Sequence, residues 1–335
     1  MTQYVKPASP KADAQGRPLW RDLRIGPLRL EGNLIMAPMA GITNLPFRSV
    51  LSQFRPSLTY CEMVSSKALQ MGDQKSRALM ARHEEDGVYG VQIFGSDPEV
   101  VETAVKICEE AGRADLVDLN MGCPVKKICK TGGGVALMEN PALVEKLVRA
   151  MVRAASVPVT VKMRAGKTQS DKNAVEIAKA AEAGGAAAIT VHARTQADFF
   201  SGGPDFEILR MVKEAVSAPV IGNGGVRTPR DAERMLAETG VDGVMIGHGA
   251  IHEPWIFERA RRYLLGEDAG GEVTPAERRD MIRRHYAKMI ARFGDAKAAP
   301  MMRKHLAWYT RGLPEGARFR GLINTLETSA EALAA

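Results

Sequence analysis

The chain has 335 residues, of which 45% are hydrophobic and 25% charged, and its formal net charge is +7. This composition is typical of a soluble globular protein with one large domain and room for a small one, and no apolar run is long enough to span a membrane. Residues 1–20 lack the apolar segment and cleavage site of a secretion signal, so we expect a frayed polar arm and a cytoplasmic protein. The four cysteines have no CxxC spacing, which argues against a disulfide framework, an iron-sulfur cluster or any other metal site.

From residue 34 onward, short apolar segments rich in branched residues alternate eight times with helical patterns. The expected strands are Leu34–Met39, Leu58–Met63, Val88–Phe94, Leu116–Met121, Val157–Met163, Ala187–His192, Ala218–Gly222 and Gly243–Ile246. The expected helices are Leu45–Leu51, Ser66–Met71, Pro98–Ala111, Pro141–Ala155, Ala174–Ala183, Phe206–Val216, Pro229–Glu238 and Pro254–Leu264. Strict alternation predicts a parallel sheet, and eight units predict a closed (β/α)8 TIM barrel over residues 21–266. A doubly wound open sheet is the alternative fold.

In such a barrel, functional residues lie where strands end and loops begin. Those positions carry Thr43, Asn44, Glu62, Gln92, Asn120, Cys123, Lys162, Arg164, His192, Arg194, Asn223 and His248. Two glycine-rich turns, Asn223-Gly224-Gly225 and Gly247-His248-Gly249, follow the seventh and eighth strands, where many barrels bind a phosphate. They predict a phosphorylated cofactor, although glycine also serves tight turns for geometry alone.

One thiol stands out among these strand-end residues. Cys123 lies in the turn Asn120-Met121-Gly122-Cys123-Pro124, where the glycine and the proline leave it at the mouth of the turn. We therefore predict that Cys123 is catalytic, the alternative being a buried structural thiol. Lys162, at the end of the fifth strand, has the alternative of a Schiff-base lysine.

The C-terminal part, residues 274–335, changes to a helical pattern and is expected to form a small all-α domain. It opens on a capping box at Thr274-Pro275-Ala276-Glu277. Residues 274–320 hold twelve Lys or Arg against four Asp or Glu, a net charge of +8. Basic residues at helical spacing and interleaved aromatic residues favour contact with a nucleic-acid backbone, whereas a solvated helix face is the alternative. The basic face consists of Arg284, Lys288 and Arg292, and the aromatic residues are Tyr286, His305, Trp308 and Tyr309.

Several segments resemble, in order and spacing, the FMN-dependent tRNA-dihydrouridine synthases, the bacterial B-type branch most of all. The resemblance rests on APMAGITNLPFR, VQIFGSDPE, DLNMGCPVKKICKTGGGVALM, VTVKMRAG, ITVHART, VIGNGGV and GHGAIHEPWIF, and it covers nearly the whole chain. It implies FMN contacts by Pro38, Met39, Ala40, Gln92, Lys162, His192, Asn223, Gly224, Gly225, Gly247 and His248. Asn120, Arg164 and Arg194 are implied to bind substrate, and the C-terminal helices with Arg284, Lys288 and Arg292 to bind tRNA. The chain departs from the family at His248, where an arginine is common.

The resemblance also implies a reaction: NADPH or NADH reduces FMN, which reduces the C5–C6 double bond of specific D-loop uridines in tRNA. Hydride would pass from flavin N5 to C6, and Cys123 would protonate C5 as a neutral thiol. The target base must swing out of the folded RNA. No obligate protein partner is expected. The alternatives are an FMN-dependent dihydroorotate or dihydropyrimidine dehydrogenase acting on free pyrimidines, and a non-catalytic RNA-binding barrel protein.

Overall fold

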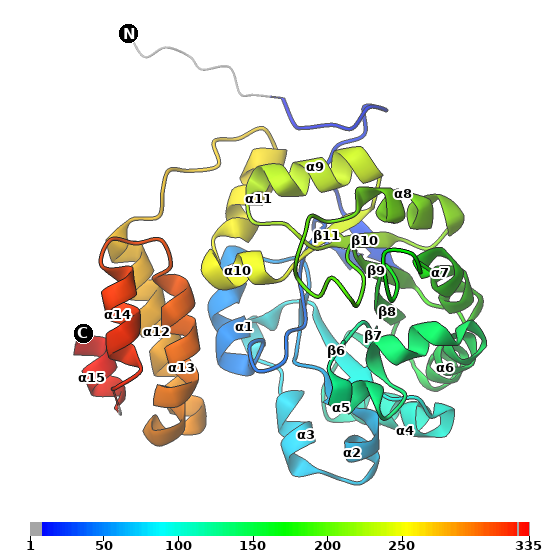
Figure 1. Cartoon of the computed structure of the whole chain (residues 1–335), viewed down its shortest axis with the longest axis horizontal. Helices are drawn as coiled ribbons and strands as arrows, with labels where there is room; N and C mark the ends of the chain where they lie inside the picture. Colours follow the sequence, from blue (N-terminus) through cyan, green and yellow to red (C-terminus); the bar gives the residue numbers. More distant parts are fainter. Residues whose placement is uncertain (1–8, 327, 335) are drawn as a thin grey trace.

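A ring of parallel strands forms the centre of the computed structural model, which describes residues 9–326 and 328–334 (Figure 1). Strand neighbours follow the order β3-β11-β10-β9-β8-β7-β6-β4, with β5 also paired to β6. The strands are β3 Leu34–Met36, β4 Thr59–Tyr60, β5 Val64–Ser65, β6 Tyr89–Phe94, β7 Leu116–Met121, β8 Val159–Arg164, β9 Ala188–His192, β10 Val220–Asn223 and β11 Gly243–Ile246. A parallel bridge between Ile35 and Leu58 closes the ring between β3 and β4. The predicted (β/α)8 barrel is therefore confirmed.

Helices surround this ring on the outside (Figure 1). They are α1 Leu45–Leu51, α2 Ser66–Gln70, α3 Gln74–Leu79, α4 Pro98–Glu110, α5 Lys126–Cys129, α6 Pro141–Ala154, α7 Ala174–Ala183, α8 Phe206–Ala215, α9 Pro229–Thr239, α10 His248–His252 and α11 Ile256–Leu264. Several begin as the sequence indicates. At α9, for example, the Thr228 side chain accepts a hydrogen bond from Asp231 N, and the Asp231 carboxylate accepts one from Thr228 N. Such reciprocal capping satisfies amide groups that have no partner inside the helix.

A short hairpin precedes the barrel and was not expected from the sequence. It consists of β1 Leu23–Ile25 and β2 Leu28–Leu30, which pair antiparallel. Its apolar side chains join a buried cluster made by residues near the beginnings of the barrel strands. This cluster contains Leu23, Ile25, Leu30, Ile35, Leu58, Leu116, Ala188 and Ile221. The hairpin therefore closes the barrel at the end where the strands begin, and a cavity is left for the opposite end.

The polar arm is anchored to the barrel over its described part. Lys11 N donates to Leu264 O at 2.8 Å, and Leu19 N donates to Lys11 O at 2.9 Å. The Leu19 side chain is only 1% exposed. The expectation of a frayed arm is thus wrong for residues 11–20, because burial of one apolar side chain fixes the segment, while residues 1–8 lie outside the described residues. Among the described helices, none is long and apolar enough to cross a membrane.

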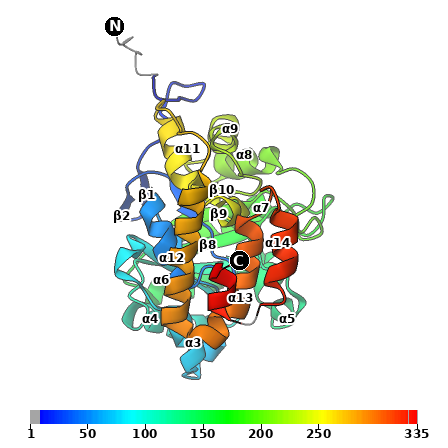
Figure 2. The same ribbon diagram turned by 90° about the vertical axis from the view of Figure 1, so that its left-hand side faces the viewer.

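The C-terminal helices stand beside the barrel as a separate group (Figure 1). They are α12 Pro275–Phe293, α13 Asp295–Tyr309, α14 Gly316–Ile323 and α15 Ser329–Ala334. The first three share a core of Tyr286, Met289, Ala298, Met302, Leu306 and Ile323. The contact with the barrel is aromatic: Phe47 of α1 lies 5.6 Å from the His285 ring and 5.5 Å from the His305 ring. Figure 2 shows α12, α13 and α14 side by side on this flank.

Three of the four aromatic residues that the sequence analysis placed beside the basic face are buried. Tyr286, His305 and Tyr309 are each 0% exposed. The expectation that they interleave with basic residues against RNA is therefore wrong for these three, while Trp308 is partly exposed and its role stays a prediction. Their helical spacing indicated a shared face correctly, but that face meets the barrel and the neighbouring helix instead of solvent.

His305 gives this interface a pH dependence that can be measured. Burial, together with His285 and Lys304 nearby, lowers the pKa of His305 well below its ordinary value. The unfolded chain takes up a proton near pH 6.5 and the folded chain does not, so stability falls as pH drops below that value. We expect His305→Phe to reduce the loss of unfolding free energy between pH 7 and pH 5 by about 2 kcal/mol. Urea unfolding at both pH values measures it.

A matched control is His83→Gln, which changes a partly exposed histidine in a surface turn. If His305→Phe lost as much unfolding free energy between pH 7 and pH 5 as the wild type does, this account of the interface would be contradicted.

Candidate active site

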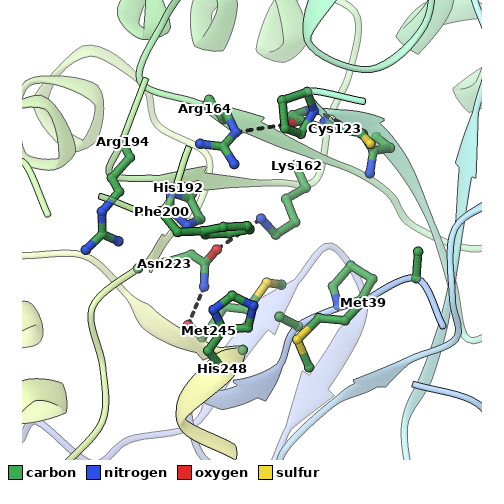
Figure 3. A pocket seen from close by; sticks show the side chains of 18 of the residues that line it. Met39, Cys123, Lys162, Arg164, His192, Arg194, Phe200, Asn223, Met245 and His248 are labelled. Carbon is green, nitrogen blue, oxygen red and sulfur yellow. Dashed lines mark hydrogen bonds between the residues drawn. The ribbon is translucent and has the colours of Figure 1, made fainter. Parts of the chain in front are cut away.

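A cavity of about 370 Å³ opens at the end of the barrel where the strands end (Figure 3). Its volume lies within the range of roughly 300–1,000 Å³ that small-molecule sites occupy. Every barrel residue that the sequence analysis assigned to a catalytic, cofactor or substrate role lines it. These are Pro38, Met39, Ala40, Gln92, Asn120, Cys123, Lys162, Arg164, His192, Arg194, Asn223, Gly224, Gly225, Gly247 and His248.

The turn that carries Cys123 is held by the side chain of Asn120. The Asn120 Oδ1 atom accepts hydrogen bonds from Gly122 N at 3.2 Å and from Cys123 N at 2.9 Å. Cys123 O accepts one from Val135 N at 3.1 Å. Burial raises the pKa of the Cys123 thiol above its ordinary value. The sulfur is therefore protonated at neutral pH, which suits a proton donor and not a nucleophile.

A chain of hydrogen bonds fixes the amides beside this turn. Asn120 Nδ2 donates to Gln92 Oε1 at 2.8 Å, and Gln92 Nε2 donates to Asp118 Oδ2 at 2.7 Å. Thr160 completes the chain by donating to Asp118 Oδ1 at 2.6 Å. Burial raises the pKa of Asp118 to about 6. Both amide orientations are set by partners on neighbouring strands, so Asn120 and Gln92 have fixed positions on the cavity wall.

The cation of Lys162 lies on the neighbouring strand β8, where Lys162 pairs with Asn120 of β7. Its Nζ atom donates to Asn223 Oδ1 at 3.0 Å, and Asn223 Nδ2 donates to Met245 O at 2.7 Å (Figure 3). Burial, and then the neighbouring Arg164, lowers the pKa of Lys162 to about 8. The side chain thus keeps its positive charge at neutral pH and is placed by strand β10.

Two arginines hold the loop of residues 195–202 over the cavity. Arg164 donates through Nε to Gly122 O at 2.9 Å and through one terminal nitrogen to Thr195 O and Phe199 O, both at 2.9 Å. Arg194 in turn donates to the carbonyls of residues 201 and 202, with distances of 2.7–3.2 Å. Both residues line the cavity as expected. Nε and one terminal nitrogen of each guanidinium group are, however, already bound to backbone carbonyls.

The loop brings an aromatic ring into the site that the sequence analysis missed. The Phe200 ring centre lies 4.6 Å from that of His248 and 6.2 Å from that of His192 (Figure 3). Arg164 Cζ lies 5.6 Å from the same ring centre. No sequence pattern predicts a role for this residue, because the pair Phe199-Phe200 lies in a loop and outside any motif. Arg227, also missed, lines the cavity close to His248.

Two histidines face the cavity in the neutral form. Burial, and then three nearby cations, lowers the pKa of His192 to about 2, and burial also lowers the pKa of His248. His192 Nδ1 is buried and has no hydrogen-bond partner. A buried polar atom without a partner is costly, so this nitrogen is open to a ligand. The adjacent Gly224 has a φ of 114°, a conformation that side chains rarely adopt.

The C-terminal helices contact, at two places, segments that adjoin the cavity wall. Lys304 Nζ donates to Gly41 O, while Gly41 N donates to the Glu62 carboxylate. Met39 and Ala40, which line the cavity, directly precede this clamped glycine. His252 of α10 lies 3.4 Å through Nδ1 from Trp308 O. Helix α13 therefore supports both the loop after β3 and the helix after β11, a contact that no sequence pattern indicated.

The predicted basic face of α12 lies outside the cavity. Lys288 Nζ is 3.6 Å from the Glu85 carboxylate, and Arg292 donates to Ala78 O at 3.4 Å. Arg284 is exposed. Their role in binding RNA stays a prediction. Within residues 9–326 and 328–334, no group of three or more His, Cys, Asp or Glu residues could hold a metal ion.

The fold and the cavity thus define a (β/α)8 barrel protein with a cysteine, a lysine and two glycine turns at one small-molecule site. The family model described as dihydrouridine synthase matches residues 35–335. A probable tRNA-dihydrouridine synthase of Rickettsia conorii is 39% identical, covering 91% of this chain and 92% of its own. The tRNA-dihydrouridine synthase B of Pseudomonas putida is 41% identical, covering 91% and 90%. The chain therefore belongs to the dihydrouridine synthase family.

Solved structures of other enzymes share the barrel at low sequence identity. A 2-naphthoyl-CoA reductase complex aligns with a TM-score of 0.58 and 11% identity, over 75% of this chain and 52% of the other. Morphinone reductase aligns with a TM-score of 0.53 and 15% identity, over 82% and 94%. These likenesses support the fold.

Proposed function

We propose that this chain is a flavin-dependent tRNA-dihydrouridine synthase of the B type, an oxidoreductase that reduces the C5–C6 double bond of uridine in tRNA. Family membership over most of the chain supports this activity. The single structural observation that carries it is the protonated Cys123 thiol on the wall of a cavity that also presents Lys162 and Asn120. A cavity with a neutral acid on one side and fixed amides beside it suits protonation of a flat base.

The cavity residues fit FMN. The glycine turns after β10 and β11 line the cavity, where backbone N–H groups suit a phosphate, and His192 Nδ1 offers a buried polar atom without a partner. Lys162 would place a positive charge near the flavin ring, where reduced flavin carries negative charge. Bound flavin would supply the hydride. We further propose FMN as the flavin and NADPH or NADH as its reductant.

The chain's own residues supply the proton for the base, hold the thiol in place and cover the cavity. Cys123 holds the proton that C5 of the base receives, and Asn120 fixes the turn that carries the thiol through its Oδ1 atom, while its Nδ2 atom is bound to Gln92. Arg164 joins the Cys123 turn to the loop of residues 195–202, which covers the cavity. For tRNA to reach this site, the target uridine must leave its stack. We propose D-loop uridines as targets and the basic C-terminal region, 274–335, as the tRNA-binding part.

The test uses purified protein, FMN, each nicotinamide nucleotide and a tRNA transcript without modifications. Mass spectrometry of the digested RNA should show two added hydrogens at defined uridines. Reduction of free pyrimidines with indifference to tRNA would favour a dihydropyrimidine dehydrogenase. Protein that binds no flavin would favour the non-catalytic barrel.

A further inference from the structure

One end of the cavity is built from two turns that touch each other. The turn after β10 contains Gly224 and Gly225, and the turn after β11 leads into α10 at His248. A Cβ atom on Gly249 would lie 2.3 Å from Val226 O, so the two backbones meet without room for a side chain. This contact places residue 227, which follows Val226, beside the start of α10.

The charges available at this end are few. His248 is neutral, because burial and the arginines nearby lower its pKa. Arg194 uses Nε and one terminal nitrogen to hold the carbonyls of residues 201 and 202, and is only 9% exposed. His248 therefore brings no charge to the glycine turns, whereas Arg194 keeps its other terminal nitrogen beside Gly224, with the rest of its guanidinium group bound to the loop of residues 195–202.

Arg227 differs from both. Its backbone N–H donates to Asp231 Oδ2 at 3.0 Å, which fixes the start of the side chain. Its side chain lines the cavity and is exposed. Over residues 9–326 and 328–334, the guanidinium group makes no recorded hydrogen bond, ion pair or ring contact. It is thus a positioned but uncommitted cation, with its charge felt at both His248 and Arg194.

We propose that Arg227, and not His248, supplies the positive charge that binds the terminal phosphate of the flavin in this chain. The inference rests on the proposed function and refines it. A guanidinium group matches two phosphate oxygens with two parallel donors, whereas a neutral imidazole offers one donor and no charge. The backbone of the Gly224-Gly225 turn and the buried His192 Nδ1 atom beside it complete a polar environment for the ligand. The charge that the family commonly places after β11 is here placed after β10.

Comparing FMN with riboflavin isolates the phosphate. Riboflavin lacks the phosphate but keeps the ring and the ribityl chain. We expect Arg227→Gln to weaken FMN binding by about 10- to 100-fold, as loss of a charged hydrogen bond does, with riboflavin affinity almost unchanged. Titration of apoprotein followed by flavin fluorescence measures both dissociation constants. Arg230→Gln, an exposed arginine three residues further along the chain, is the matched control and should alter neither.

A double variant tests whether the positive charge can be moved from residue 227 to residue 248. Arg227→Gln combined with His248→Arg should recover most of the lost preference for FMN over riboflavin, since it returns the charge to the turn after β11. Equal affinity losses for both flavins in Arg227→Gln would show that the residue only shapes the turn, and an unchanged FMN preference would show that it does not contact phosphate. Either result would overturn the assignment. Wild-type protein that binds neither flavin would instead overturn the proposed function itself.

Discussion

Replacing Cys123 by alanine is expected to lower dihydrouridine formation by about 10²- to 10⁴-fold, the contribution of a positioned general acid. The flavin should remain bound, because the Cys123 side chain is one of many cavity contacts and its backbone stays held by Asn120. Single-turnover product formation on tRNA, measured with flavin-loaded protein, separates these two effects. The rate of flavin reduction by NADPH should be unaffected.

Cys129→Ala provides the control for this change. Its sulfur is also partly exposed and lies 3.6 Å from Cys123 O, yet Cys129 does not line the cavity. We expect its product yield to be close to that of the wild type. Full activity of Cys123→Ala would remove the thiol from the mechanism, whereas equal losses in both variants would point to damage of the shared turn.

Substitution of Arg164 should be the second most severe change. The side chain bridges the Cys123 turn and the loop of residues 195–202 through three backbone carbonyls. Arg164→Met leaves those carbonyls without their donor and frees both segments. A misplacement of about 1 Å can cost roughly 10²-fold in rate, so we expect kcat to fall by about that factor. Steady-state kinetics with tRNA measure it.

The pattern of the kinetic loss distinguishes two roles for Arg164. A residue that positions the thiol lowers kcat, while one that only binds RNA raises KM for tRNA and leaves kcat unchanged. Arg164→Lys should not restore kcat, since one ammonium group cannot reproduce the planar fork of donors. Lys167→Met, a nearby cation paired with Glu139 on the surface, is the control and should leave kcat unchanged. A pure KM effect in Arg164→Met would contradict the positioning role.

The expected strands and helices match the structure closely, with differences mainly at their ends. Helix α7 has the same bounds as expected, and β8 extends one residue further, to Arg164. The expected strand Leu58–Met63 is shortened to β4, and β5 begins only after its expected end; between them Glu62 accepts a hydrogen bond from Gly41 N. Alternation of apolar segments reports which residues are buried. It does not show that Glu62, within this segment, binds the loop that follows β3.

The sequence by itself determined the barrel, the set of strand ends that form the cavity, and the thiol at a glycine-proline turn. These features depend on periodicity, capping and order along the chain, which are local properties. Only the tertiary structure decided that Arg164 and Arg194 donate hydrogen bonds to loop carbonyls and that Lys304 donates one to Gly41 O. It alone also placed the Phe200 ring beside His248 in the site. The physical reason is that these contacts join distant segments through backbone carbonyls. Every residue carries such a carbonyl, so no residue type marks the partner in advance.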